Sequence, residues 1–150
     1  MLSARPSDTI LLMYQENGHI TRINDDPNHS PSSTTNLIVV YGTLHSRPTD
    51  TFQDVTASLF YADIEGLRAT GPFDDGHCYQ DNETPIALMR RSKSQRPHID
   101  GEGQNLWCGT RVGLSKALHP GDIYTLYWVW NFSGAANEMY TTCMDILIVE

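Results

Sequence analysis

Residues 123–132, with the sequence IYTLYWVWNF, form the longest candidate strand in this chain of 150 residues. Side chains alternate between the two faces of an extended strand. One face then carries Tyr124, Leu126, Trp128 and Trp130, and the other carries Ile123, Thr125, Tyr127 and Val129. Because both faces are largely apolar or aromatic, both have to be covered. We therefore expect residues 123–132 to be the central strand of a sheet.

The rest of the chain is divided into short segments by 11 Gly and 8 Pro residues, with no long helical period. Further apolar runs occupy residues 9–14, 36–41, 57–61 and 143–149. Polar stretches at residues 24–35 and 90–104 contain Pro and predict long loops. Short strands separated by turn signals favour an all-β, antiparallel sandwich. We find no internal repeat and no boundary, so residues 1–150 are expected to form one domain.

The charge of the chain excludes several classes of partner. Its 10 Lys and Arg against 18 Asp and Glu give a net charge of −8. Such an acidic surface argues against nucleic acid or an anionic membrane. No apolar run approaches the roughly 20 residues of a membrane helix, and no secretory signal precedes the first strand. We expect a soluble, monomeric globular domain.

Candidate functional residues stand at two places, and each has an ordinary structural alternative. His19 follows Gly18 directly after the run at residues 9–14, where a glycine lets the backbone turn sharply. Taken alone, this pattern favours a simple turn. Near the other end, Glu138 and Tyr140 would share one face of an extended chain. They could complete a metal site, or they could be a loop acid and a core tyrosine.

Cysteines and sequons leave the cellular compartment open. The chain has three cysteines, an odd number: Cys78, Cys108 and Cys143. Three triplets match the glycosylation sequon, at Asn28, Asn82 and Asn131. Together they hint at a secreted protein, whereas three reduced cytosolic thiols remain the alternative.

One basic run interrupts the acidic sequence. Arg90, Arg91, Lys93 and Arg96 place four positive charges within seven residues. They could meet an anionic glycan, but charge runs are more often merely solvated. We therefore expect a solvated loop here.

Five segments in this order resemble an uncharacterised family of secreted fungal proteins whose mature chain begins His-Ser-Trp-Val. They are YQENGH at 14–19, FDDGHCY at 73–79, LWC at 106–108, YTLYWVW at 124–130 and EMYTTCMD at 138–145. The resemblance covers nearly the whole chain. That family is in turn similar to the lytic polysaccharide monooxygenases.

This similarity implies a copper site, a fold and a location. Those enzymes hold copper in a histidine brace made by the amino-terminal His and a second His, and His19 matches the second position. Tyr140 matches the axial tyrosine of the copper, and Glu138 matches the acid beside it that takes part in catalysis. The resemblance also implies an immunoglobulin-like or fibronectin-like sandwich, secretion, and oxidative cleavage of a polysaccharide in the full-length relative.

The chain departs from the family at its start, because Met1 corresponds to the middle of the family's sequence. We therefore expect a truncated copy whose sandwich is incomplete on the N-terminal side and whose copper binding is weak or absent, without polysaccharide oxidation. The resemblance implies that Cys78 pairs with Cys108 and that Cys143 stays free. Two alternatives remain, which are a non-catalytic secreted protein that binds copper or cell-wall glycan, and a non-functional remnant.

Overall fold

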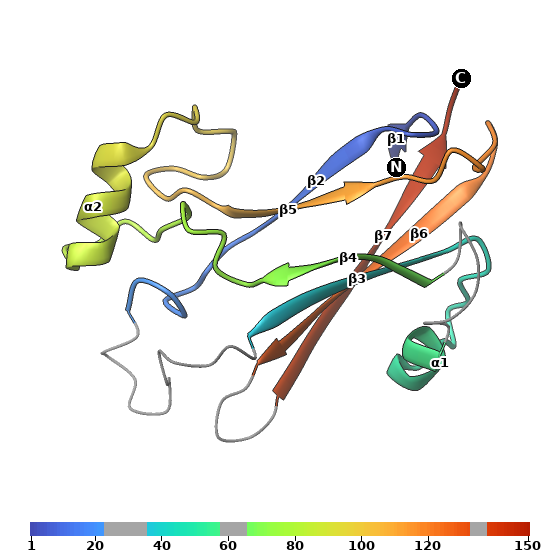
Figure 1. Cartoon of the computed structure of the whole chain (residues 1–150), viewed down its shortest axis with the longest axis horizontal. Helices are drawn as coiled ribbons and strands as arrows, with labels where there is room; N and C mark the ends of the chain where they lie inside the picture. Colours follow the sequence, from blue (N-terminus) through green and yellow to red (C-terminus); the bar gives the residue numbers. More distant parts are fainter. Residues whose placement is uncertain (23–35, 58–65, 133–137) are drawn as a thin grey trace.

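The computed structural model describes residues 1–22, 36–57, 66–132 and 138–150. Its elements in chain order are β1 (Leu2–Ala4), β2 (Thr9–Tyr14), β3 (Leu37–Thr43), α1 (Phe52–Ala57), β4 (Gly66–Pro72), α2 (Pro85–Lys93), β5 (Cys108–Gly113), β6 (Ile123–Phe132) and β7 (Glu138–Ile148). Strands predominate, and the two short helices lie at opposite ends of the molecule (Figure 1). Among the described residues, no helix is long and apolar enough to cross a bilayer.

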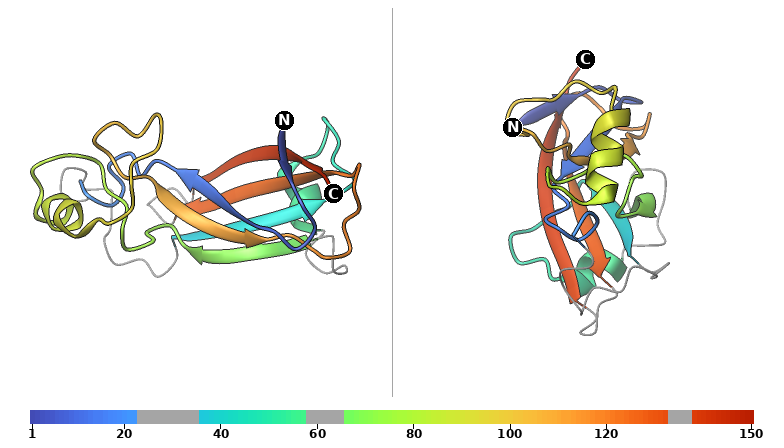
Figure 2. Two further views of the ribbon diagram at one scale, coloured as in Figure 1. Left: turned by 90° about the horizontal axis from the view of Figure 1, so that it is seen from above. Right: turned by 90° about the vertical axis from the view of Figure 1, so that its left-hand side faces the viewer.

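The strands form two sheets, a five-stranded sheet in the order β1-β7-β6-β3-β4 and a pair made of β2 and β5. The pair lies against one face of the larger sheet (Figures 1 and 2). The predicted all-β sandwich is therefore confirmed, with β6 as the central strand. One detail differs from the expected antiparallel arrangement, because β1 pairs with β7 in parallel.

The core lies between the two sheets. One face of β6 supplies Tyr124 and Leu126, which are almost completely buried. Leu12 from β2 and Val112 from β5 cover them from the opposite layer. Tyr124 fits only because β3 carries Gly42, where an added Cβ would lie 2.0 Å from the tyrosine hydroxyl oxygen. The pattern of alternate large side chains thus sets which face of β6 receives the second sheet.

Several predicted segments are confirmed or corrected. Residues 9–14 and 123–132 are strands at the predicted bounds, while the strand at 143–149 begins earlier, at Glu138. The predicted loop at 90–104 is wrong for residues 90–93, which are the last turn of α2. Residue 57 ends α1, and residues 58–61 and 24–35 lie outside the described residues.

A disulfide joins Cys78 to Cys108, so the predicted pairing is confirmed. Both cysteines are fully buried, and the bridge closes a loop between residues 30 positions apart. Beside it, Tyr79 and Leu106 exchange two backbone hydrogen bonds of 2.9 Å. Cys143 is free and exposed on β7, also as expected.

Removing this disulfide should destabilise the fold. Cross-linking a loop of this length stabilises by about 3–4 kcal/mol in the chain-entropy estimate. We expect the double variant Cys78→Ala, Cys108→Ala to lose about that much free energy of unfolding in urea titrations. The matched control, Cys143→Ser, should change stability by less than about 0.5 kcal/mol because the thiol is exposed. Equal stability of the two variants would contradict this account.

Candidate functional site

The indole of Trp130 is the centre of an aromatic cluster near the end of β6. It is 4% exposed and stacks on Phe73 with ring centroids 3.9 Å apart. Tyr140 faces Trp130 across the β6–β7 ladder and stacks on it at 5.2 Å. Cross-strand aromatic pairs of this kind stabilise a sheet. Because Tyr140 is 44% exposed, it forms the open margin of the cluster.

His19 joins the same cluster from the turn after β2. Its ring meets the edge of Trp130 at a centroid distance of 4.9 Å and that of Phe132 at 5.4 Å. It also lies 6.3 Å from Phe73 in an edge-on arrangement. The side chain is half-buried. His19 and Tyr140, which are far apart in the sequence, therefore pack against the same indole.

The turn that presents His19 depends on two consecutive residues in left-handed backbone conformation. Asn17 has φ 47° and Gly18 has φ 83°. Glycine adopts such angles without steric cost, and asparagine tolerates them better than most residues. The N–H of His19 then donates to the carbonyl of Glu16 at 2.9 Å. The expected sharp turn at Gly18 is thus present.

Glu138 and Tyr140 lie on one face at the start of β7, as their spacing predicts. The hydroxyl of Tyr140 donates a hydrogen bond of 2.5 Å to the carboxylate of Glu138. This bond, with smaller contributions from burial and from the carboxylate charge, raises the pKa of Tyr140. The phenol therefore stays protonated at neutral pH. The register places His19 beside this end of β7, because Trp130 and Phe132, which it contacts, pair with Tyr140 and Glu138.

Comparison with known families assigns the chain to one family. A family model described as a domain of unknown function, DUF7492, matches residues 1–150. The chain belongs to the DUF7492 family. No curated protein and no solved structure matches the chain. That description names no reaction or ligand, so the chemistry of the DUF7492 domain has to come from its own residues.

The donor atoms near Trp130 only partly suit a copper ion. His19, Glu138 and Tyr140 offer nitrogen and oxygen, the donor types that Cu(II) prefers. Among the described residues, however, His19 is the one histidine in the cluster. The protonated phenol is a weak donor, so this face of the DUF7492 domain could hold copper only loosely.

A second group with metal-ligand types proves to be structural. Asp75, Cys78 and Cys108 bring their ligand atoms within 4.8 Å of one another. The two sulfur atoms, however, are bonded to each other. The Asp75 carboxylate accepts backbone N–H groups of His77, Cys78 and Gly109 at 2.8–2.9 Å. Every potential ligand in this group is therefore already used.

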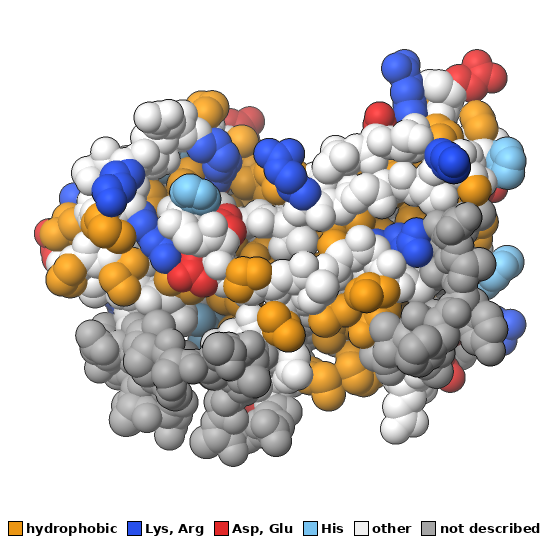
Figure 3. Space-filling model, viewed as in Figure 1, with side chains coloured by type: hydrophobic (Ala, Val, Ile, Leu, Met, Phe, Trp, Pro, Cys, Tyr) orange, Lys and Arg blue, Asp and Glu red, His pale blue; other side chains and the backbone are white. Residues whose placement is uncertain are grey.

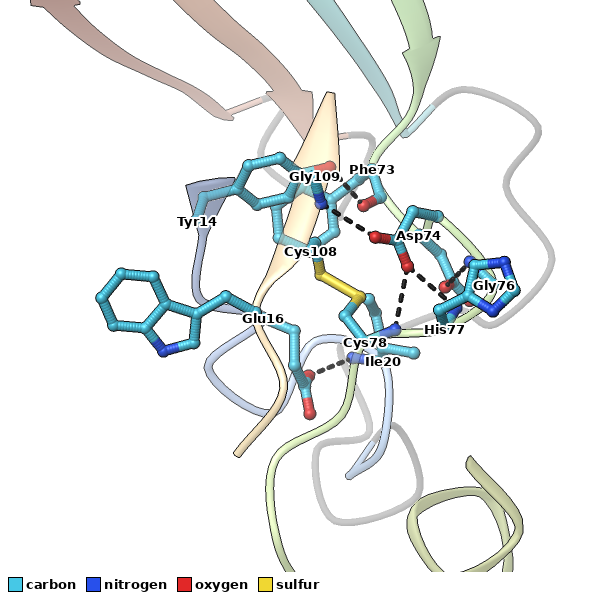
Figure 4. Close-up of a disulfide and its surroundings, with 12 residues drawn as sticks. Tyr14, Glu16, Ile20, Phe73, Asp74, Gly76, His77, Cys78, Cys108 and Gly109 are labelled. Atoms are coloured by element: carbon cyan, nitrogen blue, oxygen red, sulfur yellow. Dashed lines mark hydrogen bonds between the residues drawn. A yellow bond between two sulfur atoms is a disulfide. The ribbon is translucent and has the colours of Figure 1, made fainter. Parts of the chain in front are cut away.

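Sequence reasoning missed Glu16, a buried carboxylate that holds the His19 turn (Figure 4). It is 2% exposed and accepts the backbone N–H of Ile20 at 2.7 Å and that of Gln80 at 3.0 Å. It also accepts the N–H and hydroxyl of Thr21. The carboxylate thus ties the turn to the segment beyond the disulfide. A polar residue within the turn QENG gave no sign that it would be buried.

Replacing Glu16 by Gln should loosen this turn. The amide keeps the size of the side chain, but only one of its two terminal atoms can accept hydrogen bonds, whereas both oxygens of Glu16 accept them. We expect a loss of about 1–3 kcal/mol in unfolding free energy and faster hydrogen exchange at the amides of Ile20, Thr21 and Gln80. Glu83→Gln, at an exposed position, is the control and should change neither quantity. Unchanged exchange in the Glu16 variant would show that the carboxylate does not hold the turn.

A second buried carboxylate, Glu102, holds the loop that follows α2. It is 1% exposed, accepts the N–H of Ile99 at 2.7 Å and of Trp107 at 2.8 Å, and pairs with Arg96. Burial alone would raise the pKa of Glu102, but the bonds from Arg96 and the two backbone groups outweigh it and lower the pKa. The ionised form is therefore favoured in the folded protein.

The lowered pKa of Glu102 makes a pH-dependent contribution to stability. Its contribution is complete above the unfolded-state pKa, about 4.3, and is lost as the pH falls through the lower folded-state value. We expect Glu102→Gln to destabilise the protein at pH 7 in urea titrations, and the difference from the parent protein to shrink below about pH 4. A constant difference down to pH 2 would contradict the assignment.

Proposed function

We propose that the surface formed by His19, Tyr140 and Glu138 binds copper in a secreted protein similar to the lytic polysaccharide monooxygenases. The observation that carries the proposal is the convergence of His19 and Tyr140 on Trp130, with Glu138 hydrogen-bonded to the tyrosine. The resemblance assigns these same three residues to one copper site. An imidazole from the turn after β2 and an acid–phenol pair from β7 thus share one surface.

Each residue has a distinct role in this proposal. His19 donates a ring nitrogen to the metal, and its contacts with Trp130 and Phe132 restrict the orientation of the ring. Tyr140 keeps its proton by donating to Glu138, so a neutral phenol occupies the neighbouring side of the site. Glu138 holds that phenol in place and presents a second oxygen. Copper, when bound, would supply the activation of oxygen or peroxide.

A protein that binds copper without turnover is the second candidate. It is favoured by the single imidazole that the described residues bring to the cluster. With one nitrogen donor, we expect this chain to bind copper weakly and not to oxidise polysaccharide. The buried disulfide supports the proposed secretion, because disulfides persist mainly in oxidising compartments.

The proposal is tested by titrating Cu(II) into the chain and recording electron paramagnetic resonance spectra. Cys143→Ser serves as the background, so that the exposed thiol cannot reduce the metal. We expect weak binding with nitrogen hyperfine structure, and a further loss of affinity of about tenfold or more in His19→Ala. His119→Ala, which removes an imidazole 82% exposed beside Asp122, is the matched control.

A second variant distinguishes the role of the Tyr140 hydroxyl from that of its ring. Tyr140→Phe keeps an aromatic ring on Trp130 but removes the hydroxyl, so stability should hold while the copper spectrum changes. If the chain gave a tight tetragonal signal that survived His19→Ala, the copper assignment to this surface would be wrong. The same conclusion would follow if His119→Ala and His19→Ala weakened binding equally.

A further inference from the structure

A groove of about 750 Å³ runs between α2, the loop after it and the β2–β5 pair. Its lining holds four cations and one acid, which are Arg90, Lys93, Arg96, Arg111 and Asp75. The whole chain has 10 Lys and Arg against 18 Asp and Glu. Four of the ten cations thus line one groove of a strongly acidic protein. Figure 3 shows blue side chains gathered at this end of the molecule, with hydrophobic ones between them.

Two of these cations are already neutralised and two are not. Arg90 pairs with Asp74 at 2.8 Å, and Arg96 pairs with the buried Glu102. In the part of the chain that the structure describes, Lys93 and Arg111 make no ion pair or side-chain hydrogen bond, and both are exposed. Their charges are therefore available to a ligand. The one acid in the lining, Asp75, accepts three backbone N–H groups and is already engaged.

The groove also offers an apolar surface and unpaired donors. Leu11 is 43% and Met89 is 46% exposed, and Trp107 lies half-buried near them. Three lining residues each carry a buried polar atom without a partner among the described residues: Arg90 Nε, Ser94 Oγ and Trp107 Nε1. Buried unpaired donors are rare in native proteins and call for an explanation. A ligand rich in oxygen acceptors would provide hydrogen-bond partners for these atoms.

The wall of the groove is held in place without a ligand. Glu102 binds Arg96 and the N–H of Trp107, so the lining residues on either side of it share one anchor. On the opposite side, Gly109 and Arg111 belong to β5, next to the disulfide. A preformed groove spends little binding energy on ordering its walls.

We infer that this groove binds an acidic oligosaccharide, a sugar chain that carries carboxylates. Lys93 and Arg111 would face the carboxylates, Trp107 and the apolar side chains would pack on sugar rings, and the unpaired donors would meet hydroxyl oxygens. The groove adjoins the candidate copper surface, because Phe73 contacts His19 while Asp75 lines the groove. Phe73 and Asp75 are two residues apart, and two residues of chain span at most about 7 Å, so the two surfaces are neighbours. The inference rests on the proposed function for its choice of sugar as the ligand class.

The test uses metal-free protein in a chelating buffer, so that it does not depend on copper. We would titrate a hexamer of galacturonate and, separately, the neutral cellohexaose by calorimetry. We expect binding of the uronate alone, with an affinity that falls as salt is added. The double variant Lys93→Ala, Arg111→Ala should lose about tenfold or more in affinity. The matched control Lys116→Ala, Arg47→Ala removes two cations outside this groove and should bind as the parent does.

Several results would overturn the inference. Absence of uronate binding, equal binding of cellohexaose, or an unchanged affinity of the Lys93, Arg111 variant would each do so. Tighter binding of a hexaglutamate peptide would show that the groove serves an acidic peptide and not a sugar. Lys93→Gln, Arg111→Gln repeats the test if the alanine pair unfolds. Loss of copper binding in His19→Ala with intact uronate binding would show that the two sites act separately. The groove can then be correct even if the copper proposal fails.

Discussion

Strand β6 carries large side chains on both faces, so neither face can remain in water. On one face, Tyr124, Leu126 and Trp130 are buried beneath or beside the β2–β5 pair. On the other face, Thr125 and Val129 are buried as well. β6 lies between β3 and β7 at the centre of the five-stranded sheet, with the β2–β5 pair on one face. Gly42 shows how strict the packing is, because only a glycine leaves room there for the Tyr124 hydroxyl.

The candidate site lies towards the end of β6, where aromatic rings cover the strand in place of the β2–β5 pair. Towards its end, β6 presents Trp130 to Phe73, Tyr140 and His19, which arrive from a loop, a neighbouring strand and a turn. Aromatic rings can cover an indole while leaving polar atoms at its rim. That is why a histidine and a hydrogen-bonded acid–phenol pair lie close to buried apolar surface. Such a combination of rigid packing and exposed donors is typical of ligand sites.

The sequence was informative where burial produced a simple pattern. The two-faced run at 123–132 identified the central strand, and the spacing of Glu138 and Tyr140 placed both on one face of β7. It failed at β4, whose sequence GLRATGP has two glycines, a proline and no clear alternation. It also failed at α2, although Thr84 and Pro85 give an N-cap and first-turn signal, because that helix buries only Ala87 and shows no apolar stripe.

The basic run shows why side-chain partners lie beyond sequence reasoning. Arg90, Arg91 and Arg96 pair with Asp74, Asp81 and Glu102, which belong to other segments or to the far side of a loop. The expected solvated loop is thus wrong in part, since three of the four cations lie in α2 and three of the four are paired. Among the described residues, Lys93 is left unpaired, and it lines the same groove as Arg111 of β5. No local pattern could have brought those two cations together.

Two buried carboxylates solve the same physical problem at the two surfaces. A loop that presents functional side chains has few backbone partners, and its N–H groups still have to be satisfied. Glu16 accepts them in the turn that carries His19, and Glu102 accepts them in the loop that carries Arg96 and Trp107. In both cases one side chain replaces several backbone bonds that a strand would have made. The acid therefore orders a segment that has no strand partner, and so fixes where the side chains of that segment lie.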